Sequence, residues 1–143
     1  MVKIAQKMIS EGTLCVLSTC SDEMPNTSLM QYISNQTATK IYFITLESST
    51  KYHNIIKKPK VSLLIDTRDK LSSEEELIKS LIVYGTAKII DNGERKTNIL
   101  KCLVEKHQNL IPLSENIECR VVEVFAEKML LLNGVDDGQY LDV

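Results

Sequence analysis

Short runs of β-branched and aromatic residues, separated by polar turns, constrain the fold of this chain more than any other feature. Residues 13–19, 26–34, 40–45 and 60–66 have the composition of strands, because such side chains suit a pleated, half-buried surface. The sequence Ser-Asp-Glu-Met-Pro at 21–25 joins the first two runs and has the chemistry of a turn. We therefore predict that the sheet begins with an antiparallel hairpin.

Two longer runs extend this pattern, at residues 77–90 and 119–132. Gly85 interrupts the first of them, which indicates a bulge or bend in that strand. Apolar residues at helical spacing predict three helices, at 2–11, at 51–58 and from the segment 91–93 to about 106. Gly12 follows the first of these helices at the position of a C-cap glycine. Because strands and helices do not alternate regularly, we predict a mainly β fold, a six-stranded antiparallel barrel with peripheral helices.

The length of 143 residues favours a single domain over residues 1–143. Apolar residues make up 43% and charged residues 25%, which excludes a disordered chain. The net charge is −2, so the chain lacks the excess of basic residues that is typical of a nucleic-acid-binding domain. No apolar run approaches the roughly 20 residues of a membrane span. The N-terminus lacks the apolar core of a signal peptide, so we expect a cytoplasmic protein that binds neither nucleic acid nor membrane. We expect the tail at 134–143 to be mobile or to reach a partner chain.

Cysteine and histidine usage argues against a metal site. The four cysteines are scattered, without a Cys-x-x-Cys pair, so we expect them to stay reduced. The two histidines, His53 and His107, do not supply the spacing of zinc ligands. His107 falls at the end of a predicted helix, where the helix dipole favours a cation. No Ser-His-Asp or paired-carboxylate arrangement can be built, so no catalytic residue and no metal are predicted.

A candidate anion site lies where the third predicted strand runs into the second predicted helix. Residues 47–50, Glu-Ser-Ser-Thr, and Lys51 bring three hydroxyls and one ammonium to the start of this helix. A helix N-terminus leaves about four amides unpaired and carries a partial positive charge, so this segment is a candidate phosphate cradle. Glu47 weakens the hypothesis as a nearby negative charge. The alternative is that the serines and the threonine cap an ordinary helix.

A longer block around this segment has a family pattern. Residues 45–64 read Thr-x-x-Ser-x-x-Lys-x-x-Asn-Ile-x-x-x-Pro-x-Val-Ser-Leu-Leu. The runs LCVLST, NTSLMQYIS and KIYFIT before or within it, and VYGTAKII and VVEVFAEKMLLL after it, fit the same pattern. Over nearly its whole length the chain resembles the pyridoxamine 5'-phosphate oxidase-like family of FMN-binding split β-barrels.

This resemblance implies a split-barrel domain with an FMN site at a homodimer interface. The phosphate would be held by Lys51 and by a hydroxyl from Ser49 or Thr50. The ring and the ribityl chain would lie beside a second set of residues, Leu29, Met30, Gln31, Ile44 and Thr45. In such a protein the flavin carries the chemistry, and the protein supplies binding and orientation.

Departures from the family pattern bear on the activity. The chain has no Trp and its last arginine is Arg120, whereas the true pyridoxamine phosphate oxidases of the family carry Trp, Arg and His in a longer C-terminal stretch. We therefore expect an FMN-dependent oxidoreductase that acts on another small substrate, with electrons from a nicotinamide. Gln31 stands where a basic residue often helps to hold the phosphate. Two alternatives stay open: a non-catalytic flavin- or haem-binding protein that stores or senses its ligand, and a barrel that has lost its cofactor and serves as an interaction module.

Overall fold

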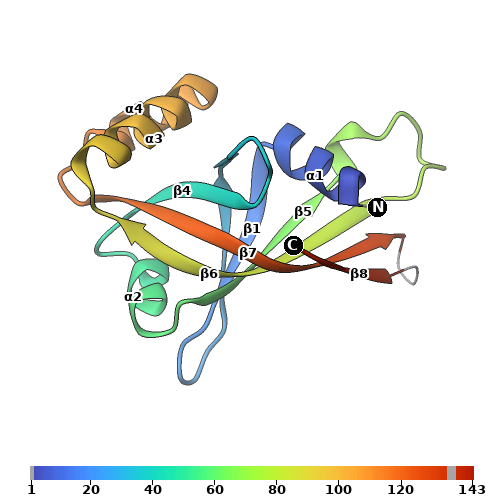
Figure 1. Cartoon of the computed structure of the whole chain (residues 1–143), viewed down its shortest axis with the longest axis horizontal. Helices are drawn as coiled ribbons and strands as arrows, with labels where there is room; N and C mark the ends of the chain where they lie inside the picture. The colour runs from blue at the N-terminus through green and yellow to red at the C-terminus, as the bar shows by residue number, and fades with distance from the viewer. Residues whose placement is uncertain (1, 135–137) are drawn as a thin grey trace.

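One antiparallel sheet forms the body of the protein (Figure 1). The computed structural model describes residues 2–134 and 138–143. Within these residues the eight strands are β1 (Leu14–Thr19), β2 (Asn26–Gln31), β3 (Ile33–Ser34), β4 (Lys40–Leu46), β5 (Lys60–Asp66), β6 (Lys79–Ile90), β7 (Cys119–Asn133) and β8 (Gly138–Asp142). Their order in the sheet is β2-β1-β5-β6-β7-β4-β3, and β8 pairs with β7 outside this path. The predicted antiparallel, mainly β architecture is confirmed.

Four α-helices and two 3₁₀ turns accompany the sheet in the described residues. They are α1 (Val2–Glu11), α2 (Thr50–Lys57), η1 (Arg68–Lys70), α3 (Gly93–Lys106), η2 (Gln108–Leu110) and α4 (Ile111–Ser114). Figure 1 shows α3 and α4 together at one end of the molecule, α1 toward the other end, and α2 beyond the end of β4. The three predicted helices match α1, α2 and α3 to within about two residues at each end, whereas no sequence pattern points to η2 and α4. None of these helices is both long enough and apolar enough to cross a membrane.

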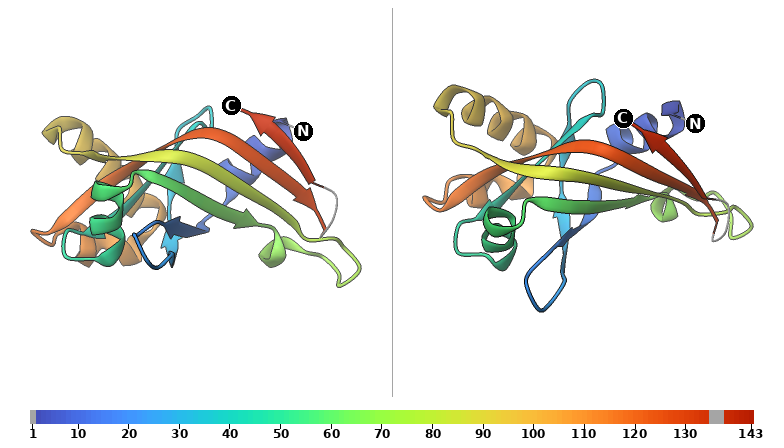
Figure 2. Two further views of the ribbon diagram at one scale, coloured as in Figure 1. Left: turned by 90° about the horizontal axis from the view of Figure 1, so that it is seen from below. Right: turned by 60° about the horizontal axis from the view of Figure 1, so that its bottom comes forward.

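The sheet curls because its two ends are joined through one residue. β2 and β3 stand at opposite ends of the strand order, yet only Tyr32 separates them along the chain. Figure 2 shows the resulting curl from two further directions. The main hydrophobic core fills its inner side and includes the fully buried side chains of Tyr32, Phe43, Leu63, Val83 and Val122.

The strand count differs from the predicted six in two places. The run at 26–34 forms two strands rather than one, because Tyr32 turns inward and its hydroxyl donates to the carbonyl of Ile9 at 2.7 Å. The C-terminal tail, predicted to be mobile or to reach a partner, pairs with β7 as strand β8 over Gly138–Asp142 and buries Leu141. Residues 135–137 of that tail lie outside the described residues.

Local predictions on the strands are confirmed. β1 and β2 form the predicted hairpin, in a register that places Leu14 opposite Gln31. The register of β6 against β7 shifts just before Gly85, which is the predicted bulge. A side chain at Gly85 would collide with the carbonyl oxygen of Phe125. The close approach of β7 therefore explains why glycine occupies this position.

Helix α3 packs against β4 and β7 through a second, smaller core. This cluster joins Leu103 of α3 to Ile44 of β4 and Val121 of β7, all of them buried. Arg95 of α3 also forms an ion pair with the buried carboxylate of Glu123 on β7. These contacts hold α3 over the end of β4, where the predicted site begins.

Candidate functional site

Two hydroxyl groups tie the end of β4 to the start of α2. The Oγ1 of Thr45 lies 2.8 Å from the Oγ of Ser49, and Thr45 is buried. Ser49 is the N-cap residue of α2, because its Oγ accepts a hydrogen bond from the amide of Tyr52 at 3.2 Å. The capping alternative is therefore correct for Ser49, and this cap satisfies one of the amides at the helix start.

Two further amides at the start of α2 are available to a ligand. Among the described residues, no acceptor takes a hydrogen bond from the amide of Thr50 or of Lys51. The ammonium of Lys51 joins no ion pair with those residues, and the Lys51 side chain is half-buried. Because a helix N-terminus also carries partial positive charge, these groups together suit an anion.

The negative charge that weakens this hypothesis in the sequence is neutralised in the fold. Glu47 forms an ion pair with Arg120 of β7, because Arg120 stands opposite Thr45 in the β4–β7 register. The Arg120 guanidinium also donates to the carbonyl of Ile117 at 3.1 Å. The sequence alone does not reveal this partner of the site, since no local pattern connects Glu47, in the turn after β4, with a residue of β7 so far along the chain.

A second group of predicted residues lines a cavity of about 320 Å³. Its lining consists of Leu29, Met30, Gln31 and Ile44 together with Leu14, Leu110 and Leu113. The volume falls within the range of small-molecule sites, roughly 300–1,000 Å³. Neighbouring residues of a strand point to opposite faces, so Ile44 faces this cavity while Thr45 faces Ser49. The eight predicted residues therefore fall into two groups, four of them lining this cavity and four at the start of α2, with Ile44 and Thr45 on opposite faces of β4.

Gln31 is the polar side chain of this smaller cavity, and two residues beyond α3 hold it. Its Nε2 donates to the Oδ1 of Asn109 at 3.0 Å, and the Nδ2 of Asn109 donates back to its Oε1 at 2.8 Å. The Nε2 of Gln31 also lies 3.4 Å from the Nδ1 of His107. His107 does end α3 as predicted, but it is buried and bonds to β2 and to the carbonyl of Tyr32 at 2.8 Å, so packing rather than the helix dipole explains it.

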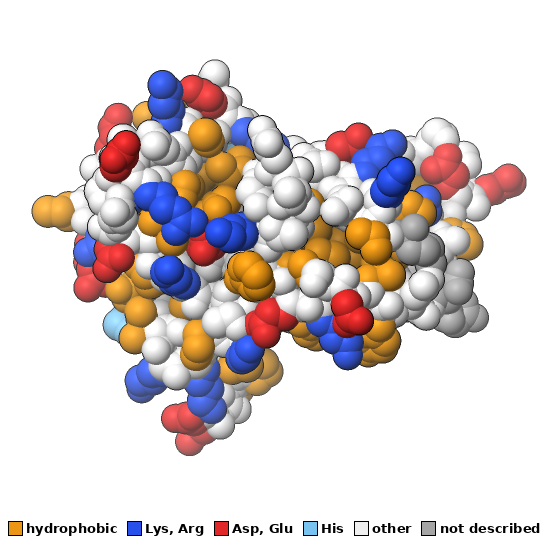
Figure 3. Space-filling model, in the orientation of Figure 1, with side chains coloured by type: hydrophobic (Ala, Val, Ile, Leu, Met, Phe, Trp, Pro, Cys, Tyr) orange, Lys and Arg blue, Asp and Glu red, His pale blue; other side chains and the backbone are white. Residues whose placement is uncertain are grey.

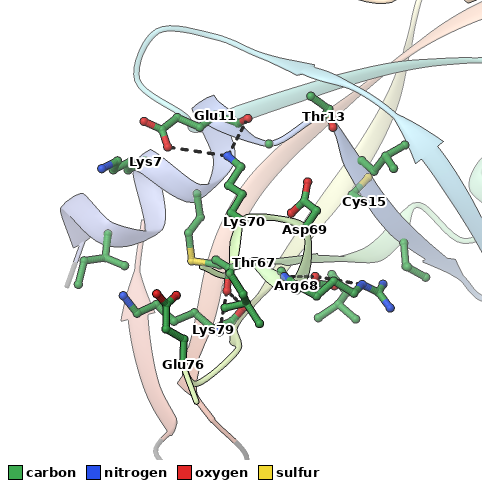
Figure 4. Close-up of a pocket in the computed structure, with 18 of the residues that line it drawn as sticks. Lys7, Glu11, Thr13, Cys15, Thr67, Arg68, Asp69, Lys70, Glu76 and Lys79 are labelled. Atoms are coloured by element: carbon green, nitrogen blue, oxygen red, sulfur yellow. Dashed lines mark hydrogen bonds and ion pairs between the residues drawn. The ribbon is translucent and has the colours of Figure 1, made fainter. Parts of the chain in front are cut away.

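A larger cavity of about 500 Å³ lies between α1, the start of β1 and the segment after β5 (Figure 4). Its apolar lining includes Leu14 and Leu29, which also line the smaller cavity. Charges of both signs stand around it, and one ion pair crosses from Lys70 to Glu11 at 3.8 Å. The polar stretch at 67–76, which contains the 3₁₀ turn η1, thus forms part of a cavity wall.

Cys15 is the one thiol among the residues that line these two cavities. Cys15 lines the larger cavity, but burial raises the pKa of its thiol to about 12, so the thiolate nucleophile is not populated near neutral pH. Within residues 2–134 and 138–143, no group of three or more His, Cys, Asp or Glu side chains is placed to hold a metal ion. The described residues therefore place unpaired donors at the start of α2 and form two neighbouring cavities.

Comparison of the sequence with family models identifies one match over most of the chain. Residues 1–128 match the model described as pyridoxamine 5'-phosphate oxidase. No curated protein matches the sequence.

Three solved structures show the similarity of fold. A haem-binding protein from Mycobacterium smegmatis superposes with a TM-score of 0.84 at 12% identity, over 99% of this chain and 57% of that protein's chain. A candidate pyridoxamine 5'-phosphate oxidase from Listeria innocua gives a TM-score of 0.74 at 15% identity, over 93% and 98% of the two chains. A FAD-binding protein from Mesorhizobium loti gives 0.75 at 12% identity, over 92% and 93%. At these identities the likeness establishes the fold alone.

Proposed function

Because the chain belongs to the pyridoxamine 5'-phosphate oxidase family, we propose that it binds FMN and is a flavin-dependent oxidoreductase acting on a small molecule. One observation at the start of α2 carries the proposal. The amides of Thr50 and Lys51 and the Lys51 ammonium have no partner among the described residues. A phosphate group matches this set of donors. When bound, the flavin supplies the redox chemistry, since its ring accepts a hydride and passes electrons on.

Different residues of the site bind different parts of the FMN molecule. Lys51 balances the charge of the phosphate, and the Ser49 hydroxyl, already bonded to Thr45, adds a fixed polar contact. The smaller cavity takes the ring, because its leucine, methionine and isoleucine side chains offer an apolar wall and keep water away. Arg120 keeps the Glu47 carboxylate from repelling the phosphate.

A homodimer with the flavin site at its interface is part of the proposal. A row of apolar side chains crosses the sheet face opposite the main core, each directly opposite the next in register: Leu29, Val16, Leu64, Ile82, Leu130 and Tyr140. The ends of this row are well exposed, Leu29 at 67% and Tyr140 at 59%. Figure 3 shows apolar side chains at the surface between charged ones. A second copy over this row would bury it and close the cavities that Leu29 lines.

The larger cavity is the proposed substrate site. It shares Leu14 and Leu29 with the smaller cavity. A substrate in the larger cavity would therefore lie beside a flavin ring in the smaller one, next to these two leucines. Its apolar lining and charged rim suit a small molecule with an apolar body and a charged group (Figure 4). The chain has no Trp and no arginine after Arg120, which supports a substrate other than pyridoxamine phosphate.

An absorption spectrum tests the cofactor. The purified protein is measured before and after FMN is added and the excess removed, and we expect a bound flavin band near one per chain. NADH oxidation by the loaded protein is then measured with a panel of small acceptors. Turnover supports an oxidoreductase, whereas bound FMN without turnover leaves a flavin-binding protein. A colourless protein that does not retain FMN would contradict the proposal and favour an interaction module.

Haem binding is the second candidate function. It is supported by the shared fold with the M. smegmatis haem-binding protein and by the apolar lining of the smaller cavity. The same spectrum separates the two cofactors, because haem and flavin absorb at different wavelengths. An intense haem band in the purified protein, together with failure to retain FMN, would replace the flavin proposal by storage or sensing of haem.

A further inference from the structure

A backbone carbonyl decides which nitrogen of His107 carries the proton. The Nε2 of His107 lies 2.8 Å from the carbonyl oxygen of Tyr32. A carbonyl only accepts hydrogen bonds, so this Nε2 carries a hydrogen and donates it. In the neutral imidazole the Nδ1 is then an acceptor. His107 is only 5% exposed, so the ring is held in this orientation by its surroundings.

The orientation of the Gln31 amide follows from this proton. An acceptor at the Nδ1 of His107 requires a donor opposite it, which places the NH₂ group of Gln31 at 3.4 Å. The second hydrogen of that NH₂ group goes to the Oδ1 of Asn109 at 3.0 Å, and the Asn109 amide returns a hydrogen bond of 2.8 Å to the Gln31 oxygen. The reversed amide would set two acceptors against each other, the Gln31 oxygen and the Nδ1 of His107.

The hydrogen bonds of Gln31 within the protein leave one of its acceptor positions for a ligand. Both hydrogens of its NH₂ group are used, one by His107 and one by Asn109. Its oxygen has two acceptor positions, of which Asn109 occupies one. Gln31 is the polar side chain among the residues that line the smaller cavity. Toward a ligand in that cavity, it is therefore an acceptor and not a donor.

We propose that Gln31, oriented by His107 and Asn109, determines the specificity of the smaller cavity by accepting a hydrogen bond from the N3–H group of the flavin ring. The inference rests on the proposed binding of FMN. In the oxidised ring N3–H is the one N–H donor, and the acceptors are N1, N5 and the two carbonyl oxygens. An acceptor fixed in an otherwise apolar lining therefore selects this edge of the ring. His107 and Asn109 are positioning residues, because they act through Gln31.

The test compares FMN with 3-methyl-FMN, in which a methyl group replaces the N3 hydrogen. Dissociation constants of both are measured by flavin fluorescence on the whole protein. We expect 3-methyl-FMN to bind about tenfold more weakly than FMN, as loss of one buried hydrogen bond predicts. In the Gln31→Leu variant the two ligands should bind equally, because the acceptor is gone while the size of the side chain is similar.

A second variant tests the positioning role. Asn109 is exposed, so Asn109→Ala should leave the melting temperature unchanged while the preference for FMN over 3-methyl-FMN falls. A preference that persists in Gln31→Leu would show that the methyl group only clashes with the cavity wall, which overturns the inference. Equal binding of both ligands to the unmodified protein would overturn it as well while leaving FMN binding intact. Failure to bind FMN at all would overturn the proposed function and this inference together.

Discussion

The hydroxyl of Tyr32 occupies the space that a side chain on Gly12 would need. A Cβ atom on Gly12 would collide with that hydroxyl and would also lie 2.9 Å from the carbonyl oxygen of Met8. The hydroxyl cannot move away freely, because it donates a buried hydrogen bond of 2.7 Å to the carbonyl of Ile9. Gly12 is predicted as a C-cap glycine, yet Gly134 is the glycine with positive φ in the described residues. Gly12 is therefore needed for space and not for backbone freedom.

We expect Gly12→Ala to lower the free energy of unfolding by about 2 kcal/mol, through overpacking and strain on the buried hydrogen bond. Urea unfolding followed by circular dichroism measures the change. The matched control is Gly93→Ala at the start of α3, where a Cβ meets nothing within 4 Å. The control should be neutral or slightly stabilising. Equal stability of the two variants would contradict the role of Tyr32 in excluding a side chain at Gly12.

The loss of the ion pair between Arg95 and Glu123 should lower the free energy of unfolding more than the loss of an exposed ion pair. The Glu123 side chain is 8% exposed and that of Arg95 is 40% exposed, so Arg95→Met leaves a buried carboxylate without its partner. We expect a loss of about 1–3 kcal/mol in unfolding free energy. Lys60→Met is the control, because the Lys60–Glu127 pair is exposed at 71% and 43% and should contribute under about 1 kcal/mol. Urea unfolding at neutral pH compares them, and a smaller loss for Arg95→Met than for Lys60→Met would be inconsistent with this account.

Stability should fall in alkaline solution because of Cys15. Burial raises the pKa of its thiol from 9.0 to about 12, so the folded protein keeps the proton when the unfolded chain loses it. For a raised pKa, the stabilisation is complete below the unfolded value and is lost as pH rises toward the folded value. We expect the free energy of unfolding to decline from about pH 9 upward, and less steeply in Cys15→Ala. Burial also raises the pKa of Tyr32, so a slope remains in the variant; identical slopes would rule out the contribution of Cys15.

If an anion binds at the start of α2, reversing the charge of Lys51 should weaken the binding of a flavin that carries a phosphate group. Lys51→Glu should weaken FMN binding about 10- to 100-fold, since an attractive charge becomes a repulsive one. Binding of riboflavin, which lacks the phosphate, should change little. Lys57→Glu in the last turn of the same helix is the matched control and should bind FMN normally. Fluorescence titration gives all these affinities. Unchanged FMN binding in Lys51→Glu would show that the phosphate does not bind at this position.

The apolar row across the sheet predicts a dimer that a single charge can break. Ile82 lies in the middle of the row and lines neither of the two cavities described above, so Ile82→Lys tests the interface without altering a cavity wall. We expect a dimer for the unmodified protein and a monomer for this variant in analytical ultracentrifugation. Ile56→Lys, at an exposed apolar residue on α2, should stay dimeric. A monomeric unmodified protein at micromolar concentration would exclude the interface.

Features encoded within one short segment are predictable from the sequence. The hairpin of β1 and β2, the bulge before Gly85 and the three longer helices each depend on residues a few positions apart. The start of α2 belongs to the same class, because Ser49, Thr50 and Lys51 are consecutive and the start of a helix brings their polar groups together; the anion site proposed there stays a prediction. Such features follow from backbone geometry and side-chain periodicity, which operate over one or two turns of chain.

Other features of the site depend on how distant strands align. Arg120 meets Glu47 across 73 residues, and Asn109 meets Gln31 across 78, so no local pattern could reveal either pair. The break at Tyr32, the pairing of β8 and the larger cavity likewise appear only when the sheet has curled. Register and curl are properties of the whole sheet, since a shift by one residue would turn every side chain to the other face. Local periodicity and turn chemistry were therefore enough to predict most strands and the three longer helices, whereas the packing of distant segments fixed which side chains share a cavity and how Gln31 is oriented in it.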